Sequence, residues 1–378
     1  MHLHTLLAQA GSRRDPKTGA ISMPIHLSSA FQHPALGQST GFDYSRTSNP
    51  TRQALEQTLS KLEGGAGASA FSSGMAALDA VLRLFSPGDK LVVTEDLYGG
   101  SFRLFEKFGR PQQLDFIYVD GSDTEAVAKA LQTPKVKGLF VEVLTNPLLK
   151  VADLDALGEL ARAHEVLFIV DNTFLTPVWC RPMEHGADIT LYSATKYLGG
   201  HHDMLAGLAV ARTGDLAEKI AFIQNAAGAV LGAFDSWLLL RSLKTLPLRL
   251  KKHEENALAV ANFLSGHAGI KKLCYPGLPS DPGHQRLGRL SLGYGAMLSF
   301  EVESSAKVES ILKSVKVFLF AESLGGAESL VTYPLIQTHA DIDPQTRERI
   351  GLTDRLLRLS IGLEDATDLM EDLAEVLK

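Results

Sequence analysis

The chain has 378 residues, 45% of them apolar, and carries 37 basic and 43 acidic side chains, which gives a net charge of −6. One compact core rarely absorbs so much apolar content, so we expect a large domain and a smaller one. The near balance of charge, without a basic stripe, argues against nucleic acid as a partner.

No segment has the roughly 18 uninterrupted apolar residues that a membrane span needs. The first residues also lack an apolar run ahead of a small-residue cleavage site. We therefore expect a soluble cytoplasmic protein that does not associate with membranes.

Neither the cysteines nor the adjacent histidines are arranged for metal binding or thiol catalysis. Cys180 and Cys274 lie far apart in the sequence, and isolated cysteines are more often small buried hydrophobic residues. His201 and His202 are neighbours, so in an extended segment they point to opposite faces and seldom bind one ion. We expect no metal site.

Residues 1–45 are turn-rich and weakly periodic, which is typical of an arm that lies over a surface, and we expect this arm to contact a neighbouring subunit. The pattern changes at Asn49, a good helix N-cap, which is followed by Pro50 at the first helical position. Leucines three or four residues apart then share one face until Gly64 ends the predicted helix.

Short apolar runs alternate with amphipathic segments through the next part of the chain. This rhythm is typical of a mainly parallel sheet covered by helices, and we expect an α/β large domain over residues 46–230. Longer helical segments, a strand-like GAMLSFEV and a closing amphipathic helix then predict a smaller C-terminal α+β domain over residues 231–378. The apolar runs are residues 91–93, 116–119, 138–143, 166–170, 189–193 and 208–211.

Ligands of open α/β sheets bind beyond the carboxyl ends of the strands, so the polar residues near those ends are candidates for a site. Ser72, Ser73, Gly74 and Met75 precede a predicted helix, and the hydroxyl and N–H groups at a helix start can bind a phosphate. An ordinary capped helix shows the same pattern, so this segment alone does not establish a phosphate site.

Asp171 ends the apolar run VLFIVD and stands beside Asn172 and Thr173. Its carboxylate is expected at the rim of the sheet, where burial demands a cationic partner. The protonated ring nitrogen of a pyridoxal cofactor is such a partner, and its charge makes the ring a better electron sink. A helix N-cap is the alternative role for this aspartate.

Lys196 follows the run ITLYSAT and precedes a tight loop at Gly199 and Gly200 instead of a solvated helix face. An amine in a partly desolvated pocket loses its proton more easily, as a lysine must to form an imine and then act as a general base. Ser193 and Thr195 are two apart, which in an extended segment directs both hydroxyls to one side, where a phosphate could bind.

Taken together, these segments resemble the Cys/Met metabolism family of pyridoxal 5'-phosphate (PLP) enzymes, which includes cystathionine γ-synthases, γ-lyases and β-lyases. The resemblance runs in order and almost from end to end of the chain. It is carried by YSRTSNPTR at 44–52, SSGMAA at 72–77, DLYGG at 96–100, TNP at 145–147, DNTF at 171–174, SATKYLGGHHD at 193–203, RSLKTLPLR at 241–249, ESLGGAESL at 322–330, THA at 338–340 and RLSIGLED at 358–365.

The resemblance implies the PLP-dependent transferase fold of type I, similar to aspartate aminotransferase, and a homodimer that completes the active site, assembled into a homotetramer. It implies that Lys196 holds the cofactor covalently, that Asp171 pairs with its ring nitrogen and that Tyr98 stacks on the ring. Further cofactor contacts are implied for Gly74, Met75, Asn146, Thr173, Ser193 and Thr195, and for Tyr44 and Arg46 from the neighbouring subunit.

The resemblance also implies where the substrate binds and which reaction follows. Arg358, with Ser323, would bind the substrate α-carboxylate, for which a guanidinium fork is well suited. Arg103 matches an arginine for polar distal ends of substrates, and Glu322 matches an acidic residue of the γ-synthase and γ-lyase branches. We therefore expect γ-replacement or γ-elimination on O-acylhomoserine, cysteine or cystathionine, as in cystathionine γ-synthases and O-acetylhomoserine thiolyases, with cystathionine γ-lyase or β-lyase activity as the alternatives.

Ser242 and His202 replace a common glycine and a common serine of the family, and a third departure lies close to the predicted site. The family commonly has E-(T/S)-P-(T/S)-N-P where this chain has Val143 and Leu144, so we expect Asn146 to be placed less rigidly. Two other classes of protein also remain as alternatives. A catalytically silent relative is the second class, which the complete set of site residues argues against. An NAD-dependent oxidoreductase is the third, and the absence of a GxGxxG turn argues against it.

Overall fold

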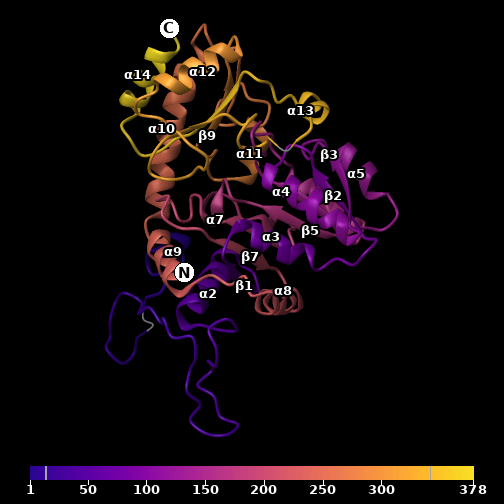
Figure 1. Ribbon diagram of the computed structural model, residues 1–378, viewed down its shortest axis with the longest axis vertical. Helices are drawn as coiled ribbons and strands as arrows, with labels where there is room; N and C mark the ends of the chain where they lie inside the picture. The colour runs from indigo at the N-terminus through magenta and orange to yellow at the C-terminus, as the bar shows by residue number, and fades with distance from the viewer. Residues whose placement is uncertain (13–14, 341) are drawn as a thin grey trace.

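The computed structural model describes residues 1–12, 15–340 and 342–378, so residues 13 and 14 of the predicted arm and residue 341 of the predicted C-terminal domain lie outside the described residues. Within these ranges the strands form two sheets, one of seven strands and one of five, and helices accompany each (Figure 1). The larger sheet uses strands up to residue 211, and the smaller sheet begins at residue 272.

The larger sheet is mainly parallel, as the alternating pattern predicted. Its strands are β1 (Gly67–Phe71), β2 (Lys90–Thr94), β3 (Asp115–Val119), β4 (Val136–Glu142), β5 (Leu167–Asp171), β6 (Ile189–Ser193) and β7 (Gly207–Ala211). They lie in the order β1-β7-β6-β5-β4-β2-β3, with β2 to β6 parallel and β7 antiparallel to both β1 and β6. Every predicted apolar run overlaps one of β2 to β7, whereas β1 was missed because GASAF is poor in branched residues.

The helices around this sheet begin and end where local chemistry favours it. They are α2 (Pro50–Glu63), α3 (Gly74–Leu82), α4 (Gly99–Leu104), α5 (Thr124–Leu131), α6 (Leu154–Ala163), α7 (Thr176–Trp179) and α8 (Gly214–Ala227), with short turns at η1 (Phe105–Gly109), η2 (Arg110–Gln112) and η3 (Pro182–His185). The Asn49 side chain accepts from the backbone N–H groups of Thr51 and Arg52, so the predicted cap of α2 is confirmed. Gly64 ends this helix with a φ of 74°, which a glycine adopts at little cost.

The smaller sheet is built by the C-terminal part of the chain. Its strands are β8 (Lys272–Cys274), β9 (Met297–Glu301), β10 (Leu319–Phe320), β11 (Leu330–Thr332) and β12 (Leu356–Ser360), in the order β10-β11-β12-β9-β8. The accompanying helices are α9 (Ala233–Leu243), α10 (Leu246–Ser265), α11 (His284–Leu290), α12 (Ser305–Ser314), α13 (Pro344–Ile350) and α14 (Ala366–Val376). Helix α10 contacts β8, β9 and α14, so it packs on this sheet, whereas α9 packs against α2.

The N-terminal segment behaves differently from the rest of the chain. After α1 (Leu3–Ala8), the described residues up to Asn49 form no helix or strand, and this segment projects away from both sheets (Figure 1). Ile21, Leu27 and Leu36 are exposed in it.

Candidate active site

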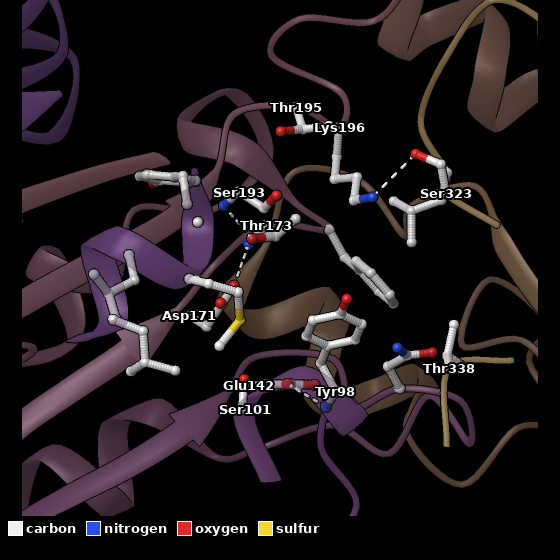
Figure 2. A pocket seen from close by; sticks show the side chains of 18 of the residues that line it. Tyr98, Ser101, Glu142, Asp171, Thr173, Ser193, Thr195, Lys196, Ser323 and Thr338 are labelled. Atoms are coloured by element: carbon white, nitrogen blue, oxygen red, sulfur yellow. Dashed lines mark hydrogen bonds between the residues drawn. The ribbon is translucent and has the colours of Figure 1, made fainter. Parts of the chain in front are cut away.

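A cavity of about 360 Å³ lies beyond the carboxyl ends of β4, β5 and β6, where the segment after β10 and strand β12 of the smaller sheet also reach. Figure 2 shows side chains from strands β4, β5 and β6 around it, together with Ser323 and Thr338 from the C-terminal part of the chain. The structure brings together most of the residues singled out in the sequence: Gly74, Met75, Tyr98, Asn146, Asp171, Thr173, Ser193, Thr195, Lys196, Glu322, Ser323 and Arg358 all line this cavity.

Lys196 extends into the cavity from the loop after β6. Its Nζ donates to Ser323 Oγ at 3.0 Å, a bond that joins the two parts of the chain (Figure 2). Burial lowers the pKa of Lys196 to about 8, and the nearby guanidinium of Arg358 acts in the same direction. An amine with this pKa is neutral in a substantial fraction of molecules near neutral pH, as a nucleophile or a general base requires.

Asp171 is the last residue of β5, and its side chain is hydrogen-bonded to Thr173. Its Oδ1 accepts from the Thr173 backbone N–H at 2.9 Å, while the Thr173 hydroxyl accepts from the Ser193 N–H at 2.8 Å (Figure 2). Burial raises the pKa of Asp171, and hydrogen bonds from Thr173 oppose that shift. A buried carboxylate fastened in this way is suited to a cationic ligand atom such as a protonated ring nitrogen.

The predicted phosphate segment meets the loop after β6. Ser73 caps α3 by accepting from the Ala76 N–H at 3.1 Å, and Gly74 follows it at the start of the helix. A Cβ on Gly74 would come within 3.1 Å of the Ser193 backbone, so a larger residue would fit only if Ser193 shifted by a few tenths of an ångström. Thr195 also lines the cavity, but its hydroxyl exchanges hydrogen bonds with the backbone of Ala206.

Tyr98 precedes α4 and projects its ring into the cavity, where it remains 42% exposed (Figure 2). Its backbone N–H donates to Glu142 Oε1 at 2.8 Å. Glu142 ends β4 directly beside Asp171 on β5. Burial, reinforced by the charge of Asp171, raises the pKa of Glu142 well above its usual range, so this carboxyl group is suited to holding a proton.

Arg358 and Asn146 form a bonded pair at the far side of the cavity. Arg358 Nη1 donates to Asn146 Oδ1 at 2.7 Å, and its Nη2 donates to the Ser323 carbonyl at 3.1 Å and to Thr332 Oγ1 at 3.2 Å. Burial lowers the pKa of Arg358 to about 10, which still leaves the guanidinium charged at neutral pH. Its Nε is buried and has no partner among the described residues.

Asn146 is hydrogen-bonded at both its side chain and its carbonyl oxygen, although the chain lacks the family proline. It is buried, Arg358 fixes its side chain, and His339 Nε2 donates to its carbonyl oxygen at 2.8 Å. His339 Nε2 also lies 3.2 Å from the carbonyl of Leu97, so this buried imidazole ties the Tyr98 segment to the Asn146 segment. Burial lowers the pKa of His339 to about 4, which keeps the ring neutral.

Two residues of this site, Glu142 and His339, received no role from the sequence. Glu142 is the penultimate residue of the apolar run GLFVEV and the last residue of β4. The rule that drew attention to Asp171 applies to it equally, since both residues end buried strands at the same edge of the sheet. His339 has no comparable signal, because its bonding partners lie far away in the sequence.

Three predicted site residues are not brought into the cavity. Arg103 is exposed on α4 and does not line it. Tyr44 and Arg46 lie in the projecting N-terminal segment, where the Arg46 guanidinium sits 5.7 Å from the Tyr44 ring centre and donates to the Asn225 carbonyl at 2.5 Å. These three residues would need another subunit or a bound ligand to take part in the chemistry.

Within residues 1–12, 15–340 and 342–378, no group of three His, Cys, Asp or Glu side chains is placed to hold a metal ion. Over the same ranges, every helix is too short or too polar to cross a membrane. Cys180 and Cys274 are buried, and burial raises the pKa of the Cys274 thiol to about 11, which is unfavourable for a nucleophile.

Comparisons with known proteins cover the whole chain. The family model described as "Cys/Met metabolism PLP-dependent enzyme" matches residues 4–378. A cystathionine gamma-synthase/O-acetylhomoserine (thiol)-lyase of Bacillus subtilis is 49% identical over 376 residues, which cover 100% of this chain and 96% of that protein. A cystathionine gamma-lyase of the same organism is 46% identical with 100% of both chains covered, and a cystathionine beta-lyase of Lactococcus lactis is 44% identical with 100% and 99% covered.

Solved structures agree with these matches. The crystal structure of cystathionine gamma synthase from Xanthomonas oryzae pv. oryzae in complex with cystathionine has a TM-score of 0.98 and 42% identity, and covers 100% of this chain and 98% of that one. Cystathionine gamma-lyase from Lactobacillus plantarum complexed with L-serine has a TM-score of 0.97 at 42% identity, with the same coverage.

Proposed function

Because the chain belongs to the Cys/Met metabolism family of PLP-dependent enzymes, we propose that it is a trans-sulfuration enzyme that acts on homoserine esters or cystathionine by γ-replacement or γ-elimination. The family match confirms the predicted PLP cofactor and enzymatic character, and the likeness to solved relatives confirms the predicted fold of type I.

The cavity has the groups that PLP requires. Lys196 would bind the cofactor through Nζ, Asp171 would pair with the ring nitrogen, and the ring of Tyr98 would lie against one face. The start of α3 and the neighbouring hydroxyls would hold the phosphate, through Gly74, Met75, Ser193 and Thr195, with Thr173 and Asn146 completing the contacts. When bound, PLP withdraws electrons from the α-carbon of an amino acid and so acidifies its proton.

Lys196 is the group best placed to move protons. Once its amine is free, Nζ can take the proton from the substrate α-carbon and later return it to the product. Its lowered pKa, near 8, matches this double role, because both the neutral and the charged amine are then accessible near neutral pH. Ser323 Oγ, at 3.0 Å, would orient the amine between these steps.

Arg358 would bind the α-carboxylate of the substrate. Asn146, Ser323 and Thr332 hold its guanidinium in place, so little side-chain freedom remains to be lost on binding. Its buried positive charge at the cavity wall favours a carboxylate there. Such a contact fixes the α-carbon near Lys196.

The single observation that favours γ-chemistry on substrates with a distal ammonium group is Glu322. It lines the cavity one residue before Ser323, and its charge opposes the lowering of the Lys196 pKa. A carboxylate here attracts the distal ammonium of cystathionine, while Arg103 on α4 is proposed for distal carboxylates. Cystathionine γ-lyase activity is the alternative that the same residue favours, since cystathionine is the product of the replacement and the substrate of the elimination.

A substrate panel tests the reaction. The purified enzyme is incubated with O-acetylhomoserine, O-succinylhomoserine or cystathionine, each with and without cysteine, and products are identified by mass spectrometry. Cystathionine formed from an ester and cysteine supports γ-replacement, and 2-oxobutanoate supports γ-elimination. Pyruvate and homocysteine from cystathionine as the only products would contradict the proposed γ-chemistry and indicate a β-lyase.

The proposal includes a homodimer in which Tyr44 and Arg46 of one subunit reach the cofactor phosphate of the other, and a homotetramer built from two such dimers. It is supported by the projecting N-terminal segment with its exposed apolar side chains and by the absence of both residues from the lining of their own chain's cavity. A cytoplasmic location is also proposed, which the small charged substrates favour.

A further inference from the structure

A chain of buried polar groups lies beside the cofactor cavity and has no role in the chemistry described above. Glu63 ends α2, Thr190 and Tyr192 belong to β6, and Asn172 follows β5. Each of these side chains is at most 1% exposed. Polar groups are buried this completely only where hydrogen bonds offset the lost hydration.

The hydrogen bonds of these groups run in one direction. Asn172 Nδ2 donates to Tyr192 Oη at 3.0 Å and to the Cys180 carbonyl at 2.8 Å. Tyr192 Oη in turn donates to Glu63 Oε1. Glu63 is therefore the terminal acceptor of a chain that starts at the amide of Asn172.

At the other end of this hydrogen-bonded series, the carboxyl group of Glu63 can hold one proton. Glu63 Oε2 and Thr190 Oγ1 both lack a hydrogen-bond partner within the described part of the molecule. A proton on Oε2 would donate to the Thr190 hydroxyl and so pair both atoms. Burial raises the pKa of Glu63 to about 8, with the hydrogen bond from Tyr192 opposing the shift, so a neutral carboxyl group prevails at neutral pH.

At the end of this hydrogen-bonded series nearest the cavity lies Asn172, which stands between the cavity residues Asp171 and Thr173. Asp171 and Thr173 line the cavity, whereas the side chain of Asn172 is bonded to Tyr192 and Cys180. On the cavity side, Thr173 bonds to Asp171 and to Ser193 (Figure 2). The segment carrying Asp171 is thus held by side-chain hydrogen bonds from two directions.

We infer that Glu63, acting through Tyr192 and Asn172, is a positioning residue for the Asp171 carboxylate that is proposed to pair with the ring nitrogen of PLP. The neutral carboxyl of Glu63 fixes the phenol, the phenol fixes the amide, and the amide fixes the backbone on which Asp171 is mounted. This inference rests on the proposed role of Asp171 and is independent of which substrate the enzyme uses.

The experiment compares PLP affinity and the visible absorbance of the holoenzyme in matched variants. Glu63→Gln keeps one acceptor for Tyr192 and one donor for Thr190, so its PLP dissociation constant should stay within about twofold of wild type. Glu63→Leu and Tyr192→Phe break the chain and should weaken PLP binding about tenfold, as expected for the loss of one buried hydrogen bond. The pH midpoint of the absorbance change should shift in these two variants as well.

Leu59→Ala provides the control for a merely structural effect. Leu59 is fully buried on α2, and its truncation lowers stability without touching a hydrogen bond of the chain. It should lower the melting temperature and leave PLP affinity unchanged. Equal PLP affinities for Glu63→Leu and Leu59→Ala, or a Glu63→Gln variant as weak as Glu63→Leu, would overturn the inference.

Asp171→Asn separates this inference from the proposal beneath it. If that variant weakens PLP binding while Glu63→Leu and Tyr192→Phe do not, Asp171 keeps its role and the inference alone fails. If Asp171→Asn leaves both affinity and absorbance unchanged, the role of Asp171 fails and the inference falls with it.

Discussion

Lys196 Nζ donates to Ser323 Oγ at 3.0 Å, and the carbonyl of the same serine accepts from Arg358 Nη2 at 3.1 Å. Ser323, which lies between strands β10 and β11 of the smaller sheet, therefore bonds both the Lys196 amine and the Arg358 guanidinium. Ser323 adopts a φ of 115°, a conformation that residues other than glycine rarely adopt. Strained backbone of this kind persists where surrounding bonds over-determine it, and such positions cluster in active sites.

The first prediction concerns the lowered pKa of Lys196. Only the neutral amine attacks the PLP aldehyde, so the rate at which the apoprotein combines with PLP should rise about tenfold for each pH unit and level off near pH 8. Stopped-flow absorbance measures this rate. Lys196→Ala should show no covalent absorbance, whereas Lys251→Ala, an exposed lysine on α10, should match wild type. A rate that keeps rising to pH 10 would contradict the prediction.

The second prediction concerns Arg358. Replacing it with lysine removes the planar fork and leaves Asn146 Oδ1 without its partner, so kcat/KM should fall on the order of 100-fold while PLP affinity stays unchanged. Steady-state kinetics and visible absorbance together separate the two effects. Arg355→Lys alters a half-exposed arginine just before β12 and should be close to wild type. Equal kinetics for both variants would remove the proposed carboxylate site.

Residues at strand ends could be predicted from the sequence because buried parallel strands appear in it as short continuous apolar runs. The apolar runs of β5 and β6 placed Asp171 and Lys196 correctly at one edge of the sheet, and two hydroxyl residues beside Lys196 were found by the same reasoning. Glu142 lies at the same edge of the sheet but received no role from the sequence. Its carboxylate accepts from the Tyr98 backbone N–H, and no sequence pattern indicates such a bond.

Other residues depend on contacts that no local pattern encodes. His339 and Glu63 are single polar residues in the sequence, and only the packing of distant segments makes them buried. Strand β1 lacks branched residues and is defined by its pairing with β7. The proposed role of Tyr44 and Arg46 requires a second subunit, so the family resemblance was its only source.

The third prediction concerns the buried carboxyl of Glu63. Its pKa is raised in the folded protein, so its contribution to stability is complete below the unfolded pKa of roughly 4.3 and is lost as pH rises toward 8. Relative to Glu63→Gln, which does not titrate, the wild type should lose at most about 1.4 kcal/mol of unfolding free energy per pH unit over that window. Urea denaturation at several pH values measures the difference. A constant difference from pH 5 to 8 would show that Glu63 is ionised throughout.

The fourth prediction concerns Glu322 as a determinant of substrate choice. Glu322→Gln removes the charge that attracts a distal ammonium, so kcat/KM for cystathionine should fall about tenfold and that for O-acetylhomoserine, which lacks a distal ammonium, should change less than about twofold. Glu328→Gln, a half-exposed carboxylate in the same segment, serves as the control and should leave both values unchanged. Equal losses for the two substrates of Glu322→Gln would mean that this residue supports the site without selecting the substrate.

The fifth prediction tests whether two subunits share each active site. Arg46→Ala should be nearly inactive if Arg46 serves the phosphate of its neighbour, and Lys196→Ala should be inactive because it lacks the amine. After co-refolding in equal amounts, half of the dimers are mixed, and each mixed dimer has one site with both residues intact. Activity should therefore recover to about a quarter of the wild-type value. If each site is complete within one chain, every site in the mixture carries a lesion and no activity returns, which would remove the proposed role of the N-terminal segment.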